Sequence, residues 1–184
     1  MSEISKTDLS IPMDKANLYS LIPVLPVVLP LVAAYIWRWG GAAFWDGLNA
    51  LFANFLVFIV VFFVGVIVHE LIHGFAWMWF GRKPFGVIKF GFQLKTLTPY
   101  AHCTVPLPVT PYRWGAAMPG ILLGILPALI AIFNGNGFLL AFGLLFTVAA
   151  GGDLLILWLI RHVDGSKLVE DHPTNAGCYI LDPQ

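Results

Sequence analysis

The stretch LVFIVVFFVGVIVHELIH, residues 56–73, decides how this chain folds. It belongs to a longer segment, because the 22 residues from Gly47 to Val68 carry no charge. A run of that length and apolarity predicts a helix that crosses a bilayer. The run leads directly into the motif HELIH, residues 69–73, and ionisable groups inside such a helix are costly and usually functional.

The motif has the pattern HExxH, which places three reactive side chains on one turn of that helix. Positions four residues apart face the same way, so the imidazoles of His69 and His73 can hold one zinc ion. Glu70 would then lie beside the open coordination position, where it can act as the catalytic base. The motif therefore predicts zinc-activated hydrolysis within a membrane.

The composition supports a membrane location. Of the 184 residues, 59% are hydrophobic and only 11% are charged, whereas a soluble domain carries about 25% charged residues. The formal net charge is zero, so there is no electrostatic case for binding nucleic acid. The two cysteines, Cys103 and Cys178, match no zinc-ribbon spacing. We expect one membrane-embedded domain over residues 1–184, with the lipid bilayer as its surroundings.

Four uncharged stretches are long enough to cross a bilayer, at about residues 18–37, 50–80, 114–133 and 138–160. Pro23, Pro26 and Pro30 interrupt the first stretch and predict a kinked or partly unwound start. Asp46 is a candidate N-cap for the second stretch, and Gly81 is a candidate C-cap. The turn-forming sequence NGNG, residues 134–137, separates the third stretch from the fourth.

Basic residues predict the orientation of these spans. The loop between the third and fourth spans carries no basic residue. The loop between the second and third spans carries five, namely Arg82, Lys83, Lys89, Lys95 and Arg113. By the positive-inside rule that loop is cytoplasmic, and so are both termini. The first 17 residues lack the features of a signal peptide, so we expect the first span to be retained. A bacterial cytoplasmic membrane is the expected location.

The same loop contains a candidate hairpin. Residues 85–94 alternate as a strand does, and residues 100–105 could pair with them. The predicted fold class is therefore an all-α polytopic membrane protein, with about four transmembrane helices and a small β-hairpin-like cytoplasmic loop between the second and third.

A catalytic zinc site usually has three protein ligands, and Asp153 is the candidate for the third. Of the ten acidic residues, only Glu70 and Asp153 lie inside an apolar span. His73 precedes Arg82 by nine residues and Asp153 precedes Arg161 by eight, which places each roughly 12–14 Å along its helix from a basic end. The second and fourth spans run in the same direction, so the two depths match. We predict that Zn²⁺ is bound by both motif histidines and Asp153.

Two other histidines are alternative ligands. His102, in the loop, could complete the site instead of Asp153 or contact the substrate, and His172 offers a smaller possibility of the same kind. Gly151 and Gly152, just before Asp153, would let another helix approach closely. The same residues would also suit a non-catalytic membrane protein with a structural metal site, which is the alternative function.

Three segments, HELIHG (69–74), GGDLL (151–155) and DHPTNAGCYI (171–180), resemble a bacterial family of putative zincin peptidases, known mainly as a domain of unknown function. The layout is more distantly similar to that of site-2 proteases, the intramembrane zinc metalloproteases. This resemblance implies that His69, His73 and Asp153 are ligands and that Glu70 activates water. It implies a zinc metalloprotease acting on a membrane-protein or peptide substrate.

Overall fold

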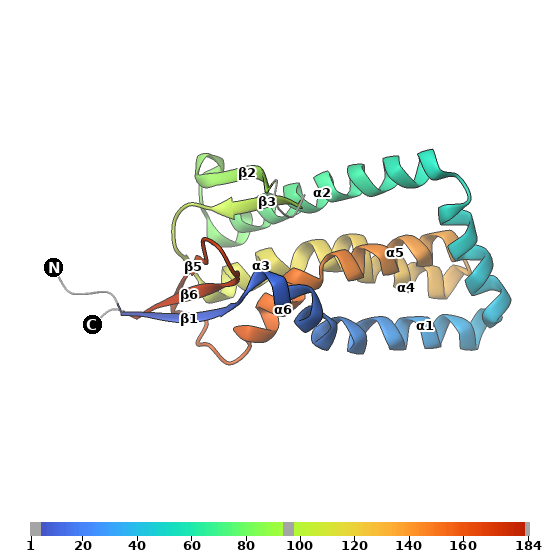
Figure 1. Cartoon of the computed structure of the whole chain (residues 1–184), viewed down its shortest axis with the longest axis horizontal. Coiled ribbons are helices and arrows are strands. Elements are labelled where there is room, and N and C mark those ends of the chain that lie inside the picture. Colours follow the sequence, from blue (N-terminus) through green and yellow to red (C-terminus); the bar gives the residue numbers. More distant parts are fainter. Residues whose placement is uncertain (1–4, 94–97, 183–184) are drawn as a thin grey trace.

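The computed structural model describes residues 5–93 and 98–182. Its helices run along the long axis of the molecule, and its strands gather near one end of the bundle (Figure 1). The polypeptide is mainly helical, as predicted, but the strands are more extensive than the sequence suggested.

The first helix, α1, covers Met13–Phe52 and is much longer than the predicted span at 18–37. Of the predicted kinked or partly unwound start, the unwound form is wrong, because the backbone stays helical through the three prolines. The one residue of α1 with non-helical dihedral angles is Gly40, at φ 86° and ψ 159°. Glycine tolerates positive φ because it has no Cβ. After Gly40, α1 turns across one end of the bundle to reach α2 (Figure 1).

The second helix, α2, covers Phe55–Gly81 and carries the HExxH motif. Its N-cap is Asn54, whose side-chain oxygen accepts a 3.1 Å hydrogen bond from a backbone N–H of the first turn. The prediction that Asp46 caps this helix is wrong, because Asp46 lies within α1. At the other end Arg82, not Gly81, adopts the left-handed conformation, with φ 50°.

The third apolar segment is continuous but changes its helical pitch. It consists of α3 (Val109–Pro119), a π-helical stretch (Gly120–Ile125) and α4 (Leu126–Asn134), so it begins five residues before the predicted span at 114–133. The predicted turn follows: Gly135 ends α4 in the left-handed conformation, and the side chain of Asn136 caps the next helix.

The last apolar segment is bent. Helices α5 (Gly137–Ala149) and α6 (Gly151–Leu159) meet at an angle of 48°, where the sequence predicted a single span at 138–160. Within the described residues, three segments are long and apolar enough to cross a membrane, namely α1, α2 and α3–α4. The pair α5–α6 is a fourth if its two halves form one span.

These helices keep an apolar outer surface. Only 11% of the most hydrophobic part of α2 is buried within the protein. Large hydrophobic side chains that it exposes include Phe55, Leu56, Val60, Phe63, Ile67 and Trp79. A soluble protein rarely exposes so continuous an apolar surface, whereas a helix that contacts lipid does so throughout.

The predicted hairpin in the loop is confirmed. After a single 3₁₀ turn (Phe85–Val87), strand β2 (Ile88–Gln93) pairs antiparallel with β3 (Thr98–Cys103). Leu94, the last residue of the predicted first strand, lies outside the described residues. The hairpin packs along α2, and the space above the missing Cβ of Gly74 is filled by the ring of Phe90.

A second sheet was not predicted, so the all-α fold class is too narrow. Its strands are β1 (Ser5–Ile11), β4 (Leu107–Pro108), β5 (Leu168–Asp171) and β6 (Ala176–Asp182), all antiparallel and in the order β1-β6-β5-β4. The sheet joins the two ends of the chain beside the hairpin (Figure 1). A buried apolar cluster lies between this sheet and the helices and includes Trp77, Tyr112, Ile160, Val169 and Ile180.

Candidate metal centre

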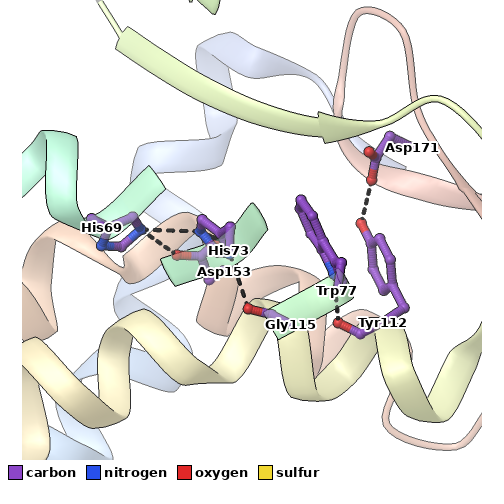
Figure 2. Close-up of polar contacts among 7 residues, drawn as sticks. All are labelled: His69, His73, Trp77, Tyr112, Gly115, Asp153 and Asp171. Carbon is purple, nitrogen blue, oxygen red and sulfur yellow. Dashed lines mark hydrogen bonds and ion pairs between the residues drawn. The ribbon is translucent and has the colours of Figure 1, made fainter. Parts of the chain in front are cut away.

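The two motif histidines lie on the inner face of α2. His69 is 8% exposed and His73 is 5% exposed, although neighbouring residues of the helix face outward. Nδ1 of His73 lies 3.0 Å from the carbonyl oxygen of Gly115 in α3 (Figure 2). A carbonyl oxygen can only accept, so Nδ1 carries a proton, and in the neutral ring this leaves the lone pair of Nε2 free to bind a metal. Histidines that bind metals are usually oriented by such a contact.

Asp153 comes from the first turn of α6 and meets both rings (Figure 2). Its Oδ2 lies 3.0 Å from Nε2 of His69, and its Oδ1 lies 3.2 Å from Nε2 of His73. The two Nε2 atoms are 3.1 Å apart. The structure therefore brings together the three side chains that the sequence singled out as ligands.

The glycines before Asp153 have different surroundings. A Cβ on Gly151 would contact Ser20 and Val24 of α1, so this glycine does allow a second helix to come close. Gly152 has nothing within 4 Å of that position and borders the cavity described below. The predicted close approach is thus made by Gly151 alone.

This donor set fits a zinc ion. Zinc bonds of about 2.0–2.1 Å at tetrahedral angles place neighbouring ligand atoms about 3.3 Å from each other, close to the distances found here. When the His73 ring is neutral, its Nε2 and the carboxylate oxygen 3.2 Å away are both acceptors, and a cation bound between them would remove their repulsion. Within the part of the chain that the structure describes, these three residues form the one group with ligand atoms so gathered, all within 4.8 Å.

Glu70 lines the same cavity as the three candidate ligands. The cavity has a volume of about 240 Å³ and lies between α2, α6 and the hairpin. On the hairpin side its wall is formed by Pro99, Tyr100 and Ala101 of β3. Ala101 and Glu70 face the same cavity from β3 and α2. A carboxylate, three metal-binding side chains and a strand edge thus border one small space.

The cavity extends along a column of aromatic rings. The imidazole of His73 stacks on Trp77, with ring centroids 5.3 Å apart, and Trp77 stacks on Tyr112, with centroids 6.0 Å apart. At the end of this column the Tyr112 hydroxyl donates a 2.6 Å hydrogen bond to Asp171, which also lines the cavity (Figure 2).

The alternative ligands have other partners. Nδ1 of His102 lies 2.6 Å from Oδ2 of Asp171 and donates a hydrogen bond to it. His172 accepts backbone hydrogen bonds from Thr174 and Asn175 at Nδ1, and its Nε2 contacts the Tyr179 hydroxyl at 2.9 Å. Neither histidine belongs to the group of candidate ligands.

Sequence reasoning missed several parts of this site. The Gly115 carbonyl belongs to the backbone and leaves no signal in residue types. The residue types of Tyr112 and Trp77 give no signal either, because aromatic side chains are common near membrane interfaces. Asp171 belongs to the DHPTN segment, which was recognised only by resemblance, and its role was open.

A family model described as "Putative zincin peptidase" matches residues 62–167, more than half of the chain. The chain belongs to this family. The zincin name implies zinc and a metalloprotease-like function, in agreement with the HExxH motif at residues 69–73, which lies inside the match. The zincin peptidase match contains all four candidate site residues and the hairpin, and it ends just before β5. Searches of curated proteins and of solved structures return no match to the chain.

Proposed function

We propose that this zincin peptidase is a zinc-dependent, membrane-embedded endopeptidase that hydrolyses peptide bonds of membrane or membrane-proximal substrates. The observation that carries the proposal is the convergence of His69, His73 and Asp153 beside Glu70, in a cavity between apolar helices. This arrangement offers three metal ligands, a base and room for a peptide in one place.

Each residue has a distinct role in this mechanism. His69, His73 and Asp153 hold the metal, and the contact of His73 with Gly115 keeps the correct tautomer. When bound, zinc supplies a water of lowered pKa and stabilises the negative charge that develops on the substrate carbonyl. Glu70 accepts the proton of the attacking water and passes it to the leaving amine.

The hairpin suggests how a substrate is held. Among the described strands, β3 pairs only with β2. Ala101 of β3 and Glu70 line the same cavity, so β3 borders the space where a substrate would lie. An extended substrate segment can add to the unpaired edge of β3 through its backbone, which keeps the peptide unwound while it is cleaved. A helical segment would need to unwind first, because its carbonyl groups are hydrogen-bonded.

The orientation follows from the basic residues near the strand-bearing end of the bundle. Arg82, Lys83 and Lys89 lie in or beside the hairpin, and Arg113 lies at the start of α3. By the positive-inside rule this end faces the cytoplasm. Water can then reach the cavity from the cytoplasmic side.

The alternative, a structural metal site, predicts a closed coordination shell. Structural zinc sites usually have four protein ligands, whereas catalytic sites have three and an open position. Three ligands gather here among the described residues, and the open side faces a cavity lined by Glu70. These features favour catalysis.

The test is made with the full chain purified in detergent. Wild type and Glu70→Gln are loaded with zinc and incubated with a mixture of synthetic transmembrane peptides, and the products are identified by mass spectrometry. The proposal expects internal cleavage by wild type that stops with chelator and in the variant. Equal cleavage by both proteins would refute it.

A further inference from the structure

The C-terminal segment beyond the family match contributes a side chain to the cavity wall. The match ends at residue 167, and β5 begins at Leu168 and ends at Asp171. The Asp171 side chain is 21% exposed, and each of its oxygens accepts a hydrogen bond, one from Tyr112 and one from His102. This carboxylate therefore joins three elements, namely α3, β3 and β5.

The contact with His102 joins two sheets that share no backbone pairing in the described chain. β2 and β3 form a two-stranded sheet, whereas β5 belongs to the four-stranded sheet. The side chains of His102 and Asp171 meet at 2.6 Å across this gap. Charge-assisted hydrogen bonds of this length are among the stronger side-chain contacts.

Asp171 is itself held firmly on its own side. The next residue, His172, fixes the following turn by accepting N–H groups from Thr174 and Asn175. Because Nδ1 of His172 accepts twice, its proton is on Nε2, which donates to the Tyr179 hydroxyl. The Tyr112 hydroxyl, from the interior of α3, restrains the carboxylate from the other side. Asp171 is thus restrained on its own side, and its contact with His102 holds the hairpin against β5.

From His102 the connection to the candidate base is short. Ala101, the adjacent residue of β3, lines the cavity together with Glu70. A strand rises by about 3.3 Å per residue. A shift of His102 by a fraction of that distance would therefore move the edge of β3 relative to the carboxylate of Glu70.

We propose that Asp171 is a positioning residue that acts through His102, holding the edge of β3 in register with Glu70 and the substrate peptide. This inference rests on the proposed endopeptidase function. It makes the C-terminal segment part of the active site, outside the region that defines the family.

The experiment compares Asp171→Asn, His102→Gln and the double variant with wild type, as full chains in detergent. Lys6→Gln is the matched control, because Lys6 forms an exposed 2.9 Å ion pair with Glu170, the neighbour of Asp171 on the same strand. The first measurement is amide hydrogen exchange of β2 and β3. The second is steady-state cleavage of a peptide that wild type cleaves, and zinc content is measured in parallel.

We expect faster exchange in β3 for both single variants and no change for Lys6→Gln. The KM for the peptide should rise about tenfold, equivalent to about 1.4 kcal/mol, with a smaller change in kcat and full zinc content. The double variant should show no faster exchange in β3 and no higher KM than either single variant, because each single substitution already removes the same contact.

Unchanged exchange in β3, or additive losses in the double variant, would overturn the proposal. An effect of Lys6→Gln equal to that of Asp171→Asn would also overturn it, because general loosening of the tail would then explain the result. If wild type cleaves no peptide, the endopeptidase function fails, and the exchange measurement alone decides whether Asp171 holds the strand.

Discussion

Nε2 of His69 lies 3.0 Å from Oδ2 of Asp153, although 84 residues separate the two in the sequence. The contact joins α2 to the first turn of α6, next to the bend between α5 and α6. It gives the candidate metal centre side chains from two helices. The site therefore depends on the packing of the bundle as well as on the motif.

The role of Asp153 can be tested by metal analysis. Asp153→Ala removes one of three ligands, so we expect the purified protein to retain much less than one zinc per chain. His102→Ala is the control and should retain zinc, because His102 contacts Asp171 instead. Inductively coupled plasma mass spectrometry measures both. Full zinc content in Asp153→Ala would exclude this carboxylate as a ligand.

Glu70 should be separable from metal binding. Glu70→Gln keeps the shape of the side chain but cannot accept a proton, so zinc content should stay at the wild-type level. The rate of peptide cleavage should fall by a factor on the order of 10²–10⁴, the usual contribution of a general base. A variant that loses zinc together with activity would instead place Glu70 among the ligands.

Zinc should stabilise the folded protein. A ligand that binds only the folded state adds about 2.7 kcal/mol when its concentration is 100 times Kd. Removing zinc with a chelator should lower the unfolding temperature in detergent, and adding zinc back should restore it. His73→Ala should show little response to either treatment. An equal response in that variant would mean that the stabilising metal binds elsewhere.

The contact between His102 and Asp171 should depend on pH. The hydrogen bond to Asp171 raises the pKa of His102 above 6.5, with its partial burial opposing the shift and the charge of Glu170 adding to it. Lys89, the cross-strand partner of His102, is the nearby cation on the hairpin. The stabilisation is fully present below pH 6.5, where His102 is charged in both states, and is lost as the pH rises through the folded-state pKa.

The measurement for this dependence is the exchange rate of β3 amides as a function of pH, corrected for intrinsic exchange. Wild type should lose protection relative to Asp171→Asn as the pH rises above neutrality, and the two should converge. A constant difference between them across this range would show that the ionic part of the contact is negligible.

The packing of α2 against α5 can be tested at Gly65. A Cβ at this position would overlap the ring of Phe146. Gly65→Ala should therefore destabilise the protein by about 1–3 kcal/mol, the usual cost of overpacking. Gly86→Ala is the control, since a Cβ there meets nothing within 4 Å. Unfolding in denaturing detergent compares the two variants. Equal stability of both would mean that α2 and α5 are not in close contact.

Local periodicity explains why the sequence was informative about the helices and the motif. The spacing of His69 and His73 needs only a helix, whose geometry is set by contacts within one turn. Asp153 stood out because a carboxylate inside an apolar segment is rare and costly. The hairpin was predictable for a similar reason, because its two strands are close in the sequence and alternate in polarity.

The termini of the helices were less predictable. Asp46 and Asn54 are both acceptable N-caps, and only the path of the chain across the end of the bundle selects Asn54. The prolines of α1 were expected to disrupt it, but Gly40 carries the break because glycine alone reaches φ 86° without strain.

By itself, the sequence predicted the apolar helices, the HExxH spacing on α2 and Asp153 as the candidate third ligand, because each prediction depends on neighbours within a few positions. Tertiary structure alone decided that Gly115 orients His73 and that β1 pairs with β6. It also decided that Asp171 forms hydrogen bonds with Tyr112 and His102. These contacts join segments 42 to more than 160 residues apart. Their formation depends on how whole elements pack, and no local pattern of residue types records that.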